Sequence, residues 1–133
     1  MIKAVFDTNV FLSALFWGGM PQQALELALS RKVQGVVSPK ILNELEDKLL
    51  DKFKFPESRT VEFLKLVSDN FETVKPEQRL KVVKEDPNDD KIVEAAVEGN
   101  AKYIVTGDKH LLKLEKFEKI EILTPREFLQ KIK

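Results

Sequence analysis

Residues 1–16, MIKAVFDTNVFLSALF, place three polar residues between two apolar segments of different character. The segment Ile2–Phe6 contains Ile, Val and Phe, which predicts a short buried strand. After Asp7-Thr8-Asn9 the apolar residues return at the spacing of a helix. An acid at the junction of a strand and a helix is either a local cap or one corner of a functional site. The rest of the chain has to distinguish between these two interpretations.

The alternation of short and long apolar segments continues to the end of the chain. Further runs predict strands at Val33–Val37, Leu80–Val83, Tyr103–Val105 and Ile120–Leu123. Between most of them, apolar residues lie three and four positions apart, and helix starts are predicted at Pro21, Ser38-Pro39, Pro56, Asn88–Asp90 and Thr124-Pro125. Strands that alternate with helices favour an α/β fold, in which a parallel sheet of about five strands is flanked by helices on both faces. We expect residues 1–133 to form one domain.

The composition indicates a soluble protein, for which we expect a cytoplasmic location. No apolar run is long enough to span a membrane, and the first residues lack the pattern of a signal peptide. The absence of cysteine excludes disulfides, thiol nucleophiles and cysteine-based metal sites. Lys and Arg together number 22, as do Asp and Glu, so the net charge is zero. Proteins that coat nucleic acid usually carry a basic excess, so a polyanionic ligand would need another means of recruitment here.

Carboxylates follow several of the predicted strands. Asp7 follows the first strand, Asp86, Asp89 and Asp90 lie in the loop KEDPNDDK after the third, and Asp108 lies in TGD after the fourth. Glu44 lies in the helix after the second strand, and helical side chains lean toward the N-terminus of their helix. In parallel sheets, ligands bind at the carboxyl ends of the strands. Separate segments of the chain are therefore expected to bring carboxylates to one edge of the sheet.

Such a concentration of carboxylates is unfavourable unless a cation neutralises it, because like charges a few ångströms apart repel. Mg²⁺ and Mn²⁺ prefer oxygen ligands and are the usual partners of such clusters. Carboxylates that hold these ions can bind a phosphodiester and activate water. A neutral protein could thus recruit a polyanion through a metal ion.

Each acid also has a purely structural interpretation. Asp7 is a plausible helix cap, and Asp86 and Asp89 fit a turn, because the tetrapeptide DPND favours one. Asp90 falls in a first helical turn, where the helix dipole favours an acid. The helical pattern alone does not separate Glu44 from its acidic neighbour Glu46. The hypothesis of a site rests on the shared placement of these residues.

Four segments of the chain resemble the PIN-domain family, and in particular the VapC-like toxin components of toxin–antitoxin systems. They are VFDTNVFLSAL, SPKILNELEDKL, DPNDDKIVEAAVEGNAKYIVTGDKHLL and ILTPREFL, in the order expected for that family. The resemblance implies a three-layer Rossmann-like fold. It also implies cleavage of RNA that depends on Mg²⁺ or Mn²⁺.

The resemblance assigns roles to individual residues. The four acids of the family match Asp7, Glu44, Asp90 and Asp108, and Asp89 competes with Asp90 for the third position. Three of them, Asp7, Asp90 and Asp108, would bind metal directly, and Glu44 would bind a second ion or orient water. The small polar residue beside the first acid matches Thr8 or Asn9, and Thr106 is similarly placed near the fourth.

The resemblance also implies partners, namely an RNA substrate and a cognate antitoxin protein that blocks the acidic cleft. Phe16 and Trp17, just before Gly18-Gly19, are expected to face a second subunit or the antitoxin, and we expect a homodimer. The alternative function is a PIN-like module that binds RNA or protein with little or no catalysis. The full set of acids argues against that alternative, because a degenerate member would be expected to lose one or more of them.

Overall fold

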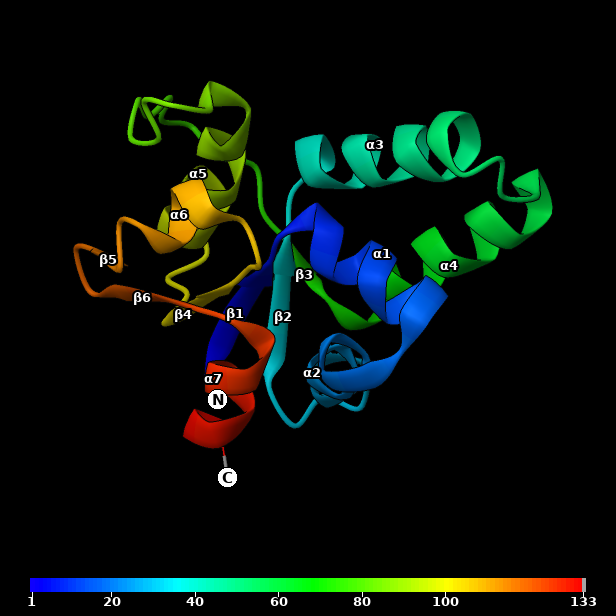
Figure 1. Ribbon diagram of the computed structural model, residues 1–133, viewed down its shortest axis with the longest axis horizontal. Coiled ribbons are helices and arrows are strands. Elements are labelled where there is room, and N and C mark those ends of the chain that lie inside the picture. Colours follow the sequence, from blue (N-terminus) through cyan, green and yellow to red (C-terminus); the bar gives the residue numbers. More distant parts are fainter. Residues whose placement is uncertain (133) are drawn as a thin grey trace.

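The computed structural model describes residues 1–132, and its centre is a six-stranded sheet (Figure 1). The strands are β1 (Lys3–Phe6), β2 (Gln34–Val37), β3 (Glu72–Thr73), β4 (Tyr103–Val105), β5 (Lys116–Phe117) and β6 (Ile120–Leu123). Their order in the sheet is β3-β2-β1-β4-β6-β5, and only β5 runs antiparallel to its neighbour. The α/β fold with a mainly parallel sheet agrees with the prediction from sequence.

Seven α-helices surround this sheet in the described part of the chain. They are α1 (Thr8–Trp17), α2 (Gly19–Leu29), α3 (Pro39–Asp47), α4 (Glu57–Asn70), α5 (Asp90–Glu98), α6 (Lys109–Leu112) and α7 (Pro125–Ile132). A π-helical segment, Lys48–Lys52, continues α3, and a 3₁₀ turn, Pro87–Asp89, leads into α5. No helix among residues 1–132 combines the length and apolarity needed to cross a membrane.

The two faces of the sheet bury different sets of side chains. Val5, Val36 and Ile104 are paired across neighbouring strands and are fully or almost fully buried. Val36 lies against α5, since a Cβ added at Gly99 would come within 2.7 Å of its Cγ1 atom. On the other face, the Phe6 ring packs against Phe128 of α7, with ring centroids 5.8 Å apart. Helices therefore cover both faces, and β1 is held in the centre of the sheet.

Close packing on the second face explains the glycine in β2. A Cβ built at Gly35 would lie 2.5 Å from Cε2 of Phe71, which is closer than carbon atoms approach in proteins. The Phe71 ring in turn packs against Phe6, with centroids 5.9 Å apart. The small residue thus lets an aromatic ring lie directly on the strand.

The predicted strand Leu80–Val83 is wrong, because the third strand consists of Glu72 and Thr73 instead. Residues 75–86, here called the strap, have no regular secondary structure apart from a short turn. Four of their backbone N–H groups donate to carboxylates that belong to α5. Leu80 N donates to Glu94 Oε2 at 2.8 Å, and Val83 N donates to Asp90 Oδ1 at 2.8 Å. The apolar run is therefore held against a helix by carboxylates and needs no neighbouring strand.

Candidate metal centre

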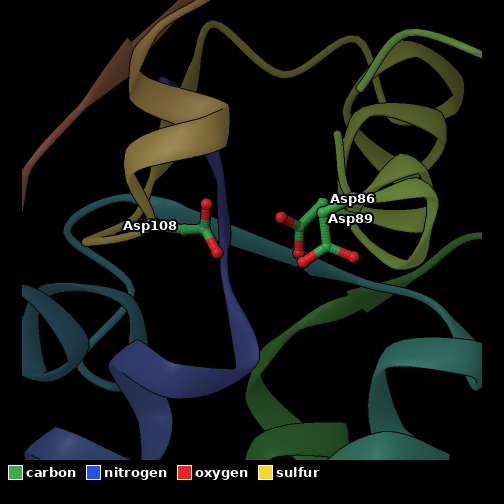
Figure 2. Close-up of side chains that lie close together, drawn as sticks. All are labelled: Asp86, Asp89 and Asp108. Carbon is green, nitrogen blue, oxygen red and sulfur yellow. The ribbon is translucent and has the colours of Figure 1, made fainter. Parts of the chain in front are cut away.

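The carboxyl ends of β1 and β4 bring their following loops together. Phe6 pairs with Val105, and Asp7 N donates to Val105 O at 2.9 Å. Asp7 therefore lies next to the loop that carries Asp108. The 3₁₀ turn before α5 brings Asp86 and Asp89 to the same place, and Figure 2 shows their carboxylates pointing toward Asp108.

Three carboxylates form a cluster that could bind a metal ion. One oxygen each from Asp86, Asp89 and Asp108 lies within 4.8 Å of the others. Asp89 is 8% exposed, and its Oδ2 atom has no hydrogen-bond partner in the described part of the chain. An unpartnered buried carboxylate oxygen beside two other acids matches the oxygen donors that Mg²⁺ and Mn²⁺ prefer.

The pKa of Asp89 is strongly raised by the surroundings of its carboxyl group. Burial of the carboxyl, together with the nearby charges of Asp7, Asp108 and Asp86, raises its pKa to about 7. The ammonium of Lys91 only partly opposes this effect. A divalent cation placed among these acids would favour the ionised form of Asp89, so the residues present fit a metal site.

Asp7 is held deeper, and a threonine links it to the loop of Asp108. Asp7 is 4% exposed, and Thr106 Oγ1 donates to its Oδ2 atom at 2.7 Å. The same Thr106 oxygen accepts from the backbone N–H of Asp108 at 2.9 Å. Burial raises the pKa of Asp7, and the Thr106 hydrogen bond partly offsets this increase. One hydroxyl thus orients two of the acidic segments.

Glu44 lies at the side of the cluster and is kept ionised by its partners. Thr8 Oγ1 donates to Glu44 Oε1 at 2.5 Å. Asn88 Nδ2 and Lys91 Nζ each lie 3.0 Å from Glu44 Oε2. Burial alone would raise the pKa of Glu44, but the hydrogen bonds from Thr8 and Lys91 lower it below its usual value. Glu44 is therefore an anion at neutral pH.

Asp90, in contrast, points toward the strap. Its Oδ1 atom accepts from Val82 N at 3.0 Å and from Val83 N at 2.8 Å. The structure thus brings Asp7, Asp89 and Asp108 together, with Glu44 beside them, while the Asp90 carboxylate fixes the strap. Asn9 Oδ1 accepts from Lys48 Nζ at 3.2 Å, and no hydrogen bond joins Asn9 to a carboxylate within residues 1–132.

Asp86 was not among the residues predicted to bind metal. Pattern analysis treats it as a turn residue, and it does serve as one, because its Oδ1 accepts from Asn88 N at 3.2 Å. The turn itself brings Asp86 to Asp89, since Asp89 N donates to Asp86 O at 3.0 Å. The DPND turn, which suggested a purely structural role for Asp86, was thus also the sequence feature that could have placed Asp86 beside Asp89.

Comparisons with known proteins agree with this architecture. Residues 3–110 match the family described as PIN domain. A protein of Methanocaldococcus jannaschii, itself described as uncharacterized, is 35% identical over 97% of this chain and 90% of its own length.

Solved structures with 14–21% identity show the same fold. VapBC-1 of nontypeable Haemophilus influenzae has a TM-score of 0.65, with 14% identity over 95% of this chain and 99% of that chain. VapBC2 of Rickettsia felis, bound to a DNA fragment from its promoter, has a TM-score of 0.62, with 16% identity over 91% of this chain and 97% of that chain. The PIN domain endonuclease Utp24 has a TM-score of 0.57, with 21% identity over 92% of this chain and 84% of that chain.

Proposed function

The chain belongs to the PIN-domain family, and on that premise we propose that it is a ribonuclease that depends on a divalent metal ion. The observation that carries the proposal is the buried, unpartnered oxygen of Asp89 within the cluster of Asp86, Asp89 and Asp108. The three neighbouring carboxylates repel one another, and none of them forms a salt bridge within residues 1–132. A metal-dependent reaction is the function that best explains this arrangement.

We assign the third acid of the site to Asp89. Asp89 lies in the cluster with Asp86 and Asp108 and has an unpartnered Oδ2 atom within residues 1–132, whereas Asp90 lies outside the cluster and its Oδ1 atom accepts from two backbone N–H groups of the strap. Mg²⁺ or Mn²⁺ would be held by Asp86, Asp89 and Asp108. Asp7 would add a further negative charge near the ion. When bound, such an ion supplies the positive charge that neutralises a phosphodiester and favours ionisation of an attacking water.

The remaining groups prepare the site for hydrolysis. Thr106 holds the Asp7 carboxylate in one orientation through its hydroxyl. Glu44, which is ionised and held by Thr8 and Lys91, is suited to orient the attacking water by accepting a hydrogen bond from it. As the water oxygen forms its bond to phosphorus, the water proton passes to solvent, the bond from phosphorus to the leaving oxygen breaks, and the leaving oxygen takes up a proton from solvent.

We also propose that this nuclease is the toxin of a toxin–antitoxin pair and acts on RNA in the cytoplasm. The support is the resemblance of four sequence segments to VapC-like proteins, together with the shared fold of the two VapBC structures. The partner in that case is a cognate antitoxin. Coexpression with the adjacent gene product, followed by purification of the complex, tests this part separately from the chemistry.

Cleavage of a pool of single-stranded and structured RNA in EDTA, Mg²⁺ or Mn²⁺ tests the reaction, with Asp7→Asn alongside. We expect metal-dependent cleavage by the wild type and a loss of at least about 100-fold in Asp7→Asn, because the charge that holds the ion is reduced. The variant is expected to fold normally or to be slightly more stable, since it relieves repulsion among the acids. If the folded wild type cleaves nothing with either ion, the alternative of a binding module replaces the nuclease.

A further inference from the structure

A groove lined by cations lies between the start of α3, the strap and α5. Two cavities of about 560 and 370 Å³ adjoin there and share Lys40, Arg79, Lys91 and Glu94 in their walls. The first is also lined by Lys81 and Lys84, and the second by Lys75. These six cations, Lys40, Lys75, Arg79, Lys81, Lys84 and Lys91, define what is here called the basic groove.

The basic groove has more cations than acids in its walls. Five of its cations are exposed and form no ion pair within residues 1–132, the exception being Lys91, which pairs with Glu44. The groove also contains Glu77, Asp90 and Glu94. Two of these acids, Asp90 and Glu94, accept hydrogen bonds from the backbone of the strap instead of binding a cation. A chain of zero net charge thus carries a local basic excess at this place.

The walls of the groove also offer apolar surface to a ligand. Leu80 and Pro87 line the larger cavity beside the cations and are at least partly exposed. A single-stranded nucleic acid presents both phosphates and unstacked bases, whereas a duplex presents only its phosphates and groove edges. The combination of cations with apolar side chains therefore suits a single strand better than a duplex.

The basic groove is continuous with the metal centre through two side chains. Asn88 and Lys91 line the groove, and both bind Glu44 Oε2 at 3.0 Å. The next residue after Asn88 is Asp89, which belongs to the acidic cluster. A strand that lies in the groove would therefore pass Glu44 and reach the carboxylates without leaving the protein surface.

We propose that the basic groove binds the sugar–phosphate backbone of single-stranded RNA beside the bond that is cleaved. The inference rests on the proposed function, because the acidic cluster gives the bound strand its reacting position. The bulk charge of the chain, which is zero, is not needed for recruitment. The cations of the groove attract the phosphates of the RNA, which the cluster of acids repels in the absence of metal.

The test measures binding without cleavage. A fluorescein-labelled single-stranded RNA of about 12 nucleotides, which is long enough to pass along one protein surface, is titrated with the full chain in EDTA. Fluorescence anisotropy is recorded over a range of salt concentrations. The variant Lys40→Gln/Arg79→Gln is compared with the wild type and with Lys32→Gln/Lys119→Gln. The control pair removes the same charge at the amino ends of β2 and β6, at the opposite edge of the sheet.

We expect the groove variant to bind roughly tenfold more weakly, with a salt dependence reduced by about 1.4 in the slope of log K against log salt. The control variant should match the wild type, and a duplex of the same sequence should bind the wild type more weakly than the single strand. Equal RNA binding by the wild type and both variants would overturn the proposal. Labelled poly-glutamate is titrated in the same way as a model of an acidic protein segment. A groove variant that binds poly-glutamate more weakly than the wild type but binds RNA equally well would also overturn the proposal.

This outcome is separable from that of the cleavage assay. Weaker binding by the groove variant supports the groove even if the wild type shows no nuclease activity. Unchanged binding in a protein that cleaves RNA removes the groove and leaves the nuclease in place.

Discussion

At the scale of single residues, Asp89 contributes a pH-dependent cost to folding. Its pKa is raised from the usual 3.8 to about 7 in the folded protein. The folded state therefore binds the proton more tightly than the unfolded state between these two values. Without metal, this group destabilises the fold above pH 7, and that cost disappears as the pH falls toward 4. Asp7 acts in the same direction, because burial raises its pKa as well.

The variant Asp89→Asn is expected to be more stable than the wild type at pH 8 in EDTA. The gain is at most about 4 kcal/mol, since one pKa unit corresponds to 1.36 kcal/mol. Thermal unfolding followed by circular dichroism at pH 5, 6, 7 and 8 measures it. The wild type should gain stability from pH 8 to pH 5, and the variant should gain less.

Mg²⁺ provides the complementary measurement. At pH 8 it should raise the Tm of the wild type, and it should have little effect on Asp89→Asn. Asp47→Asn removes an exposed acid at the end of α3 and serves as the control. A wild type and an Asp89→Asn variant with the same pH profile and the same response to Mg²⁺ would show that Asp89 is not coupled to the cluster.

The choice between Asp89 and Asp90 illustrates what sequence could not decide. Both acids are adjacent in DPNDDK, and their helical positions differ by only 100°. Their roles depend on which backbone N–H groups lie nearby, and those of Val82 and Val83 come from a segment whose placement the pattern mispredicted. The parallel pairing of β1 and β4 accounts for the nearness of Asp7 to the loop of Asp108, whereas Asp89 arrives through the 3₁₀ turn after the strap.

At the scale of elements, α5 carries a row of acids that bind the strap. Asp90, Glu94 and Glu98 are four residues apart, so they lie along one side of the helix. Each accepts from the strap backbone, and Glu98 Oε1 accepts from Glu77 N at 3.1 Å. The apolar run Leu80–Val83 has the pattern of a strand. Its N–H groups are bound by carboxylates of a helix further along the chain, and the sequence pattern does not indicate this.

Replacing Glu94 tests this row. Glu94 is 8% exposed and accepts from Leu80 N. Glu94→Ala is expected to cost about 1–3 kcal/mol, because the Leu80 N–H is left without a partner. Glu94→Gln retains an acceptor oxygen and should cost less. Chemical unfolding gives the free energy, and hydrogen exchange of residues 77–83 shows whether the strap opens.

The expected pattern is faster exchange in the strap of Glu94→Ala while the amides of β1 stay protected. Equal protection of the strap in the wild type and in both variants would mean that burial of Val83, and not the row of acids, holds the strap.

At the scale of the whole molecule, opposite charges are sorted into separate regions around one sheet edge. Carboxylates gather after β1 and β4, and the basic groove lies on the other side of Asn88 and Lys91. A net charge of zero therefore does not reveal this local separation of charge. The fold was predictable because alternation of strands and helices determines it, whereas the sorting depends on the path of the strap.

The apolar end of α1 indicates how the molecule assembles. Trp17 is 73% exposed, and its ring lies 5.9 Å from Phe16 and 6.3 Å from Phe53 between centroids. Exposure of a tryptophan beside other aromatic rings is typical of protein interfaces. We predict that this surface forms a homodimer contact.

Light scattering at micromolar concentration should give the mass of a dimer, and Trp17→Ser should shift the mass toward the monomer. Trp17 is the only tryptophan of the chain, so its own fluorescence reports the environment of the contact. Dilution of the wild type should move its emission to longer wavelength as the ring becomes exposed to water. Trp17→Gln replaces the ring with a polar side chain that is longer than serine, and this variant should also be monomeric. A wild type that is monomeric at all concentrations, with emission independent of dilution, would refute the dimer and leave the exposed ring available to a different protein partner.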